Sequence, residues 1–283
     1  LRSKNILTEQ QITNATKEIK AEINEHLQMA FNEETISADL ETELKDVFKE
    51  YQQEIIAPSN KKTNIRLIDA ISKGLRESME RYDNLVIMGQ DVAEYGGVFK
   101  ITEGFTEQFG RERVRNTPIC ESAIVAAAYG AALNGMKAVM EMQFADFVSS
   151  GFNPIVNLLA KSNYRWNQNA DVVVRMPCGA GVGAGPFHSQ TNEAWFTKTP
   201  GLKVVYPAFP EDAKGLLCAA INDPNPVLFF EHKALYRSIY QEVSDDYFTV
   251  ELGKASLLKE GNDVTIISYG AGVHWALDTL KTH

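Results

Sequence analysis

The sequence predicts an α/β fold with a mainly parallel sheet and helices on both faces, preceded by a helical arm. Beyond Asn64, short apolar stretches typical of buried strands alternate with stretches of helical periodicity. Parallel strands need a crossover of about a dozen residues or more, which is usually a helix. Residues 1–57, by contrast, contain no glycine and show only helical periodicity. These two patterns predict an arm that is distinct from the sheet.

The arm is predicted to contain two amphipathic helices. Thr8 and Gln11 have the spacing of a capping box, in which each side chain bonds the backbone of the other at a helix start. The apolar residues of the first helix are Ile12, Ile19, Ile23, Leu27 and Ala30, and those of the second are Leu40, Leu44, Val47, Phe48 and Tyr51. Two helices without a sheet bury little surface by themselves. We therefore expect residues 1–62 to form an arm that ends in an exposed linker at 58–62.

The region 63–250 is predicted to form one α/β domain. The expected helices are 67–79, 123–133, 154–164 and 211–221, and the expected strands are 85–88, 138–142, 171–176, 203–206 and 227–231. A further strand at 264–268 and a helix at 273–280 follow an acidic stretch. One strand and one helix do not make a domain. We therefore expect 251–283 to be the start of a truncated second domain.

The composition excludes several classes of protein. The net charge of −9 argues against a nucleic-acid binder, which needs clustered Lys and Arg. No apolar run reaches the roughly 20 residues of a membrane span. The three cysteines, Cys120, Cys178 and Cys218, are widely spaced and include no CxxC pair. This pattern argues against disulfides and structural zinc, favours a cytoplasmic protein, and predicts three buried thiols.

A glycine-rich stretch at 179–185 follows a predicted strand and leads to His188. Gly179, Gly181 and Ala184 satisfy the dinucleotide pattern GxGxxG/A. A dinucleotide loop opens directly into a helix, however, and here Pro186 follows; the acidic ribose partner expected about 20 residues later is also missing. The alternatives are a flexible loop, or a wall that lets a ligand approach the backbone. A histidine in this place is either structural or part of a site at the strand ends.

Two further stretches contain candidate site residues. Glu121 begins a helix rich in small residues, where the helix dipole favours a carboxylate. Local sequence leaves open whether Glu121 is a capping acid or a functional one. Gln143 and Phe147 are four residues apart, so they would share a face if a helix begins there. For Phe147, core packing is the alternative to a role in a site.

Eight stretches together resemble a known family. They are Gly89–Val92, Gly96–Lys100, Asn116–Glu121, Gln143–Phe147, His188–Gln190, Pro200–Val205, Glu211–Leu216 and Leu235–Arg237. In this order they resemble the beta subunit of the decarboxylating component of 2-oxoacid dehydrogenase complexes, over residues 64–283. Residues 1–57 resemble the C-terminal tail of the alpha subunit of the same enzymes. The resemblance thus implies a piece of a fused alpha–beta polypeptide.

The resemblance implies a site for thiamine diphosphate with magnesium. In this family an acid promotes the imino tautomer of the cofactor's pyrimidine, and Glu121 matches it. Ile119 and Gln143 match residues that line the pyrimidine pocket, and Phe147 would stack on the ring. His188 matches a residue that assists proton transfer near the reacting carbon. Glu121 and His188 are therefore the predicted catalytic residues.

This chain departs from the family pattern at two places. Gln90 replaces a glutamate that is common there, which puts a carboxylate proton relay in doubt. The Gly-Asp-Gly motif by which the alpha subunit holds magnesium and diphosphate does not occur in this sequence. The resemblance therefore implies that this chain alone binds the cofactor weakly or not at all and is inactive.

A structural potassium site is a further implication of the resemblance. Ala220, Asp223 and Asn225 match a potassium loop of the family, although a plain turn explains the same residues.

The resemblance also implies partners and a substrate. The implied partners are the alpha region, a lipoyl-bearing acyltransferase core and further copies of the chain. Gly96–Lys100 resembles enzymes for branched-chain 2-oxoacids such as 2-oxoisovalerate, whereas Phe229–His232 also resembles pyruvate enzymes. We expect the branched-chain substrate. A pyruvate dehydrogenase and another transketolase-like thiamine enzyme are the alternatives.

Overall fold

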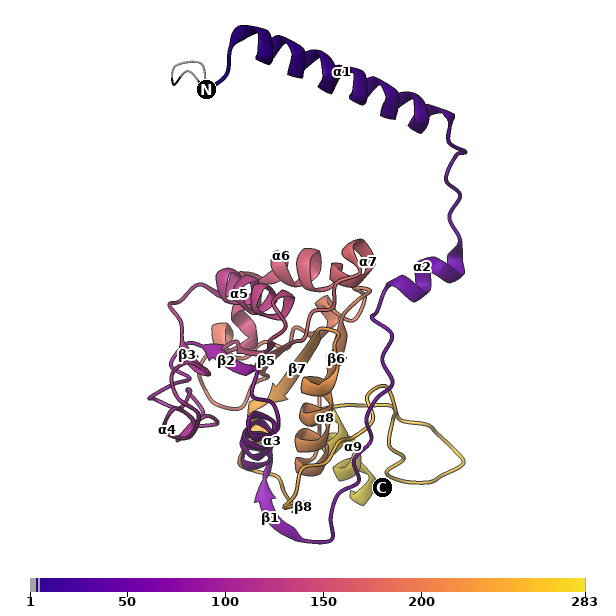
Figure 1. Cartoon of the computed structure of the whole chain (residues 1–283). Coiled ribbons are helices and arrows are strands. Elements are labelled where there is room, and N and C mark those ends of the chain that lie inside the picture. Colours follow the sequence, from indigo (N-terminus) through magenta and orange to yellow (C-terminus); the bar gives the residue numbers. More distant parts are fainter. Residues whose placement is uncertain (1–3, 5, 283) are drawn as a thin grey trace. The chain divides into compact units, whose positions relative to one another are not determined.

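The computed structural model describes residue 4 and residues 6–282 (Figure 1). The chain divides into two compact units, one up to Glu41 and one from Thr42 onward. Each unit is described by itself.

The first unit is dominated by the helix α1 (Glu9–Asn32), none of whose residues is buried. The capping box is confirmed: the Gln11 backbone N–H donates to Thr8 Oγ1 at 3.2 Å, and the Thr8 N–H donates to Gln11 Oε1 at 2.8 Å.

The second predicted helix, α2 (Leu40–Asp46), is shorter than expected. Its predicted continuation fails because the backbone pairs elsewhere; the Lys49 N–H, for example, donates to Asn225 Oδ1 at 2.7 Å.

The second unit is built on a six-stranded, wholly parallel sheet in the order β3-β2-β4-β5-β7-β6. Its strands are β2 (Leu85–Gly89), β3 (Val114–Asn116), β4 (Lys137–Glu141), β5 (Val172–Cys178), β6 (Lys203–Val205) and β7 (Val227–His232). Its longer helices are α3 (Leu67–Arg81), α5 (Glu121–Leu133), α8 (Pro210–Asn222) and α9 (Ala271–Thr282). The predicted α/β class with a mainly parallel sheet is confirmed.

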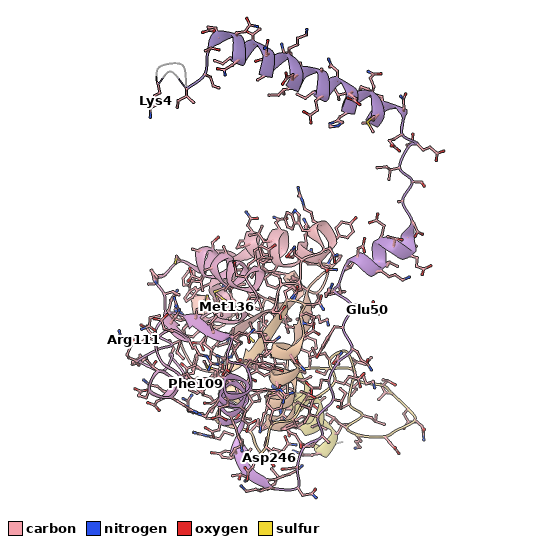
Figure 2. All side chains as sticks on the ribbon, in the orientation of Figure 1. Lys4, Glu50, Phe109, Arg111, Met136 and Asp246 are labelled. Carbon is pink, nitrogen blue, oxygen red and sulfur yellow. The ribbon has the colours of Figure 1, made fainter. Side chains whose placement is uncertain are left out.

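Alternating side chains of the strands divide the core into two layers. Ile87, Val139 and Val173 point into a layer that also contains residues of α3 and α8. Met88, Met140 and Val174, one residue along each strand, point into a layer with residues of α5. Since successive strand residues face opposite sides, continuous apolar strands require helices on both faces. The side chains fill the space between ribbon elements (Figure 2).

Several elements differ from the sequence predictions. The expected helix at 154–164 is broken into α6 (Phe152–Pro154), a π-helical turn η3 (Ile155–Leu159) and α7 (Ser162–Trp166). At the π turn the Ala160 N–H bonds the Ile155 carbonyl at 3.0 Å, five residues back.

The shorter elements are α4 (Phe105–Phe109), η2 (Ala145–Ser149), η4 (Pro186–His188), η5 (Glu193–Trp195) and η6 (Lys233–Leu235).

A second, two-stranded sheet was not predicted. β1 (Lys62–Arg66) pairs antiparallel with β8 (Tyr240–Ser244), so the end of the expected linker is a strand. The strand expected at 264–268 is wrong: the segment has no strand partner among the described residues, and Ile267 is 90% exposed. A strand needs a neighbour to bond its backbone, which local apolar character cannot supply. The helix after it, α9, is confirmed.

A buried charge cluster ties three central strands together near their carboxyl ends. Arg175 on β5 donates from Nε and Nη2 to both oxygens of Glu231 on β7, at 2.7 and 2.8 Å. Its Nη1 donates to Glu141 on β4 at 2.6 Å. The Tyr236 hydroxyl donates to Glu231 at 2.6 Å. Burial raises the pKa of Glu141, against the opposing effect of the Arg175 charge.

Candidate functional site

The candidate site lies where four parallel strands end. Gln90 follows β2, Gln143 follows β4, the glycine-rich stretch follows β5 and Lys233 follows β7. In open α/β sheets ligands bind outside the carboxyl ends of the strands, because the loops there converge. The sheet therefore brings together residues that are far apart in the sequence.

Glu121 is the first residue of α5 and is half-buried. Cys120 precedes it as the N-cap but makes no side-chain capping bond. The Gln90 amide, only 6% exposed, donates to Glu121 Oε1 at 3.1 Å. Among the residues that the structure describes, this is the one hydrogen bond to the Glu121 carboxylate. Gln90 therefore keeps a bond to the carboxylate although it lacks the charge of a glutamate.

The turn before α5 leaves Ile119 strongly exposed, at 83%. Exposure of an isoleucine side chain forgoes the favourable free energy of burying its apolar surface. Ile119 lies two residues before Glu121, so the same turn contains an exposed apolar side chain and leads to a half-buried carboxylate.

Gln143 and Phe147 do not share a helical face. Gln143 precedes the short 3-10 helix η2 that contains Phe147. The Gln143 amide approaches Asp91 Oδ2 at 3.4 Å, and Asp91 is the neighbour of Gln90. Glu121 and Gln143 are thereby connected through two consecutive residues of one loop. The condition for a shared face was a helix that begins at Gln143, and it is not met because η2 begins only at Ala145.

Phe147 and His188 are brought together. The His188 ring, half-buried on η4, lies edge-to-face against Phe147 at 5.5 Å and against Phe144 at 4.6 Å between ring centroids. Phe147 also packs against the core layer that contains α5, so core packing and site lining coexist in this residue. The sequence did not reveal Phe144, although it lies within a stretch that resembles the family.

The glycine-rich stretch opens into η4 and not into an α-helix. Gly179, Gly181, Gly183 and Gly185 all have positive φ, which side chains rarely adopt. At Gly179 a Cβ would lie 2.3 Å from the His232 ring, so this position requires glycine. The geometry does not fit a dinucleotide loop, in agreement with the argument from Pro186.

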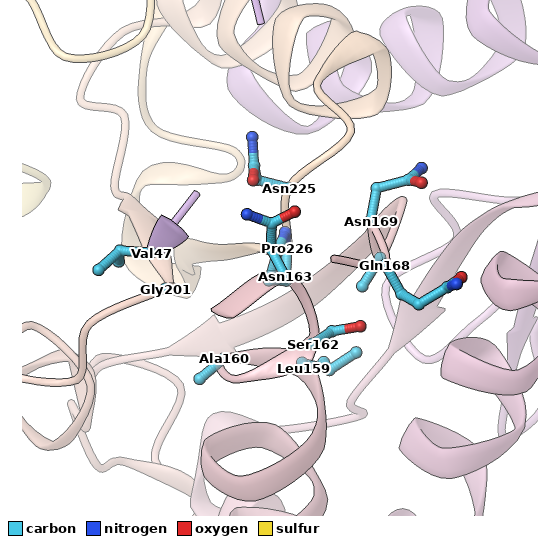
Figure 3. A pocket seen from close by; sticks show the side chains of 11 residues that line it. Val47, Leu159, Ala160, Ser162, Asn163, Gln168, Asn169, Gly201, Asn225 and Pro226 are labelled. Atoms are coloured by element: carbon cyan, nitrogen blue, oxygen red, sulfur yellow. The ribbon is translucent and has the colours of Figure 1, made fainter. Parts of the chain in front are cut away.

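Ala220 in the last turn of α8, and Asp223 and Asn225 just after that helix, are buried at the opposite end of the sheet. Asp223 Oδ2 is paired with the Lys203 ammonium, and Oδ1 accepts the backbone N–H and the side-chain amide of Asn225, both at 2.9 Å. These groups are already satisfied, so the arrangement does not fit a potassium ion held by the two side chains. Figure 3 shows Asn225 beside a small depression that Gly201 also lines.

The part of the chain that the structure describes contains no group of three or more His, Cys, Asp or Glu that could hold a metal ion. No helix within it is long and apolar enough to cross a membrane. Cys178 and Cys218 are buried as predicted, and burial raises the pKa of each thiol to about 12. Cys120 is half-exposed, contrary to expectation, because it lies at the start of α5.

Residues 63–238 match the family model of the transketolase pyrimidine-binding domain. The chain belongs to this family. The family is that of transketolase-like, thiamine-diphosphate-dependent enzymes. A pyrimidine-binding domain agrees with a half-buried carboxylate at the carboxyl edge of the sheet.

Known relatives and a solved structure have similar sequences or folds. The chain is 50% identical over 216 residues to the 2-oxoisovalerate dehydrogenase subunit beta of Bacillus subtilis, covering 76% of the chain and 66% of that protein. It is 44% identical to the pyruvate dehydrogenase E1 component subunit beta of the same organism, covering 75% and 66%. It also resembles a solved structure named split gene transketolase, inactive beta4 tetramer, with a TM-score of 0.62, 25% identity and coverage of 77% and 66%. The chain thus spans about two thirds of the length of these relatives.

Proposed function

We propose that this chain supplies the pyrimidine half of the thiamine diphosphate site in a decarboxylating, lipoamide-acylating 2-oxoacid dehydrogenase. The observation that carries the proposal is Glu121, which stands at a helix start at the carboxyl edge of the sheet with one hydrogen bond from Gln90. The names of the two Bacillus subtilis relatives support the reaction class. A different transketolase-like reaction is the alternative, favoured only by the likeness of fold.

The residues of this chain would act on the bound cofactor and substrate in distinct ways. Thiamine diphosphate, when bound, supplies the nucleophile that attacks the 2-oxo group. Glu121 would hold a ring nitrogen of the pyrimidine by a hydrogen bond and so favour the imino tautomer. Ile119, Gln143 and Phe147 would hold the ring in place by contact. His188 would transfer a proton near the reacting carbon.

The remaining groups of the complete enzyme are proposed to come from outside this chain. Magnesium and the diphosphate would be held by an alpha region of the same polypeptide or of another subunit. Residues 1–62 would be the end of that region, 63–250 the pyrimidine domain and 251–283 the start of a further domain. A lipoyl-bearing acyltransferase core and further copies of the chain would complete the assembly. A cytoplasmic location stays a prediction. So does a potassium ion at 220–225, although the side chains of Asp223 and Asn225 are already paired there.

The test of the proposal is Glu121→Gln in the complete enzyme that contains this chain. The amide keeps the shape but cannot take part in proton sharing, so we expect turnover to fall by about 100-fold or more. Assembly, measured by analytical ultracentrifugation, should not change. Glu112→Gln is the matched control, because Glu112 lies in an exposed ion pair with Arg115. Full turnover in the Glu121 variant would refute the assignment.

The substrate is proposed to be a branched-chain 2-oxoacid. The relative that carries the name of 2-oxoisovalerate dehydrogenase is 50% identical, and the relative named pyruvate dehydrogenase is 44% identical. We expect kcat/KM for 2-oxoisovalerate to exceed that for pyruvate in the complete enzyme. A higher value for pyruvate would reverse the assignment without affecting the role of Glu121.

A further inference from the structure

Two buried charged side chains lie next to His188, and the proposed function assigns no role to either. Asp146, on η2, is 7% exposed, and Lys233, at the start of η6, is 4% exposed. Burying a charge is costly unless hydrogen bonds or an opposite charge compensate. A pair of such groups beside a candidate catalytic residue calls for a physical explanation.

Asp146 holds the backbone immediately after His188. Its Oδ1 accepts the N–H groups of Ser189 and Gln190, at 3.0 and 3.1 Å. Hydrogen bonds to a carboxylate are about twice as strong as those between neutral groups. The backbone before His188, in contrast, contains four glycines with positive φ between 179 and 185, and residues 180–187 are exposed. The loop is therefore fixed more firmly after His188 than before it.

The His188 imidazole itself makes few contacts that would fix its position. Within the described structure the His188 side chain makes no hydrogen bond, and its partners are the rings of Phe144 and Phe147. Ring contacts of this kind contribute roughly 0.5–1.5 kcal/mol each and tolerate sliding. The position of the ring thus depends on where the backbone of 188–190 is anchored.

Lys233 completes the cluster. Its Nζ lies 5.5 Å from the centroid of the Phe144 ring, on whose edge His188 packs. Neither Lys233 Nζ nor Asp146 Oδ2 has a hydrogen-bond partner among the described residues. Burial lowers the pKa of Lys233, and its interactions with Cys178 and Asp146 counteract this effect.

We propose that Asp146 is the positioning residue for His188. Its carboxylate fixes the backbone of 188–190, while Lys233 places its Nζ over the Phe144 ring that His188 contacts. The meaning of this arrangement for catalysis rests on the proposed function of His188. The positioning itself is a property of this chain and can be measured on it alone.

The first experiment follows Asp146→Ala in the full chain by NMR. The Ser189 and Gln190 amides should exchange at least about tenfold faster than in the unchanged chain. The His188 ring protons, assigned with a His188→Gln variant, should lose the shift caused by the neighbouring aromatic rings. Asp171→Ala is the matched control: it removes a partly buried carboxylate paired with Lys137 at the amino end of β5 and should change neither signal.

The result that would overturn the positioning is an unchanged His188 signal in a folded Asp146→Ala chain. If the Asp146→Ala chain does not fold, amide exchange in the unchanged chain tests the positioning instead. Its Ser189 and Gln190 amides should then exchange at least about tenfold more slowly than those of Val182 and Gly183 in the same stretch. Equal exchange would overturn the proposal as well.

The second experiment separates this inference from the proposed function. In the complete enzyme, Asp146→Ala should lower kcat by up to about 100-fold and leave KM nearly unchanged, because a misplaced group impairs the reaction and not substrate binding. A displaced His188 signal together with full kcat would refute the catalytic role of His188 while the positioning stands. An undisplaced signal refutes the positioning whatever the activity.

Discussion

Two clusters of buried charge lie near the carboxyl ends of the central strands, and they are bonded differently. In the first, Arg175 bridges Glu141 and Glu231, with Tyr236 as a further donor. No buried nitrogen or oxygen of these four described side chains lacks a hydrogen-bond partner. In the second, one oxygen of Asp146 accepts a hydrogen bond from the backbone just after His188. The other oxygen of Asp146 and Lys233 Nζ have no hydrogen-bond partner in the described chain.

We infer from this difference that the first cluster is structural, whereas Asp146 in the second is proposed to position His188. The Arg175 cluster joins β4, β5 and β7, so its bonds hold the sheet edge on which the loops stand. The Asp146 cluster joins a loop to the site and leaves polar groups partly unsatisfied. In natural proteins, features that lower stability, such as buried polar groups without hydrogen bonds, occur mainly where function requires them.

The largest effect is expected for Arg175→Met. The substitution leaves two buried carboxylates without their cation, and breaking a buried pair in this way costs about 3–5 kcal/mol. The free energy of unfolding from urea denaturation measures this loss. Arg115→Met, in an exposed pair with Glu112, should cost about 1 kcal/mol or less. Equal losses for the two variants would contradict the comparison.

A smaller effect is expected for Tyr236→Phe. The change removes a donor to Glu231 and leaves a fully buried carboxylate oxygen with one bond fewer, at a cost of about 2 kcal/mol. Denaturation of the variant gives the value directly. The exposed Tyr240→Phe serves as the control and should lie within about 0.5 kcal/mol of the unchanged chain.

The pH dependence of stability tests the charge of Glu141. Burial raises the folded pKa of this carboxyl above its ordinary value of 4.5. As the pH rises past that value, the unfolded chain releases the proton first, so stability present at low pH is lost. Glu141→Gln removes this loss, so its stability relative to the unchanged chain should increase from about pH 5 to about pH 8. A relative stability that decreases over this range would contradict the assigned direction.

The smallest effect on stability is expected for Lys233→Met. The ammonium has no hydrogen-bond partner among the described residues, and methionine keeps the apolar length of the side chain. Burial already disfavours the charged form of Lys233, so removing the ammonium costs little. We expect the free energy of unfolding to stay within about 1 kcal/mol of the unchanged chain. A loss above about 3 kcal/mol would place Lys233 with Arg175 as a structural residue.

The candidate site was predicted in part from the sequence. Glu121, His188 and Phe147 were found from local context together with resemblance to a family, and the structure places His188 against Phe147. Asp146 and Lys233 were not found, although both lie within or beside quoted stretches. Their importance comes from burial and from contacts across more than 40 residues of sequence, which local spacing does not contain.

The sequence by itself determined the elements whose cause is local. The capping box at Thr8 and the apolar strand at 85–88 depend on neighbouring residues, and both were confirmed. Tertiary structure alone decided which backbone segments pair. The segment 264–268 has the composition of a strand without a partner, whereas Lys62–Arg66 is a strand because Tyr240–Ser244 lies beside it. Backbone hydrogen bonds in a sheet join distant parts of the chain, so strand pairing and loop anchoring become visible only in the folded molecule.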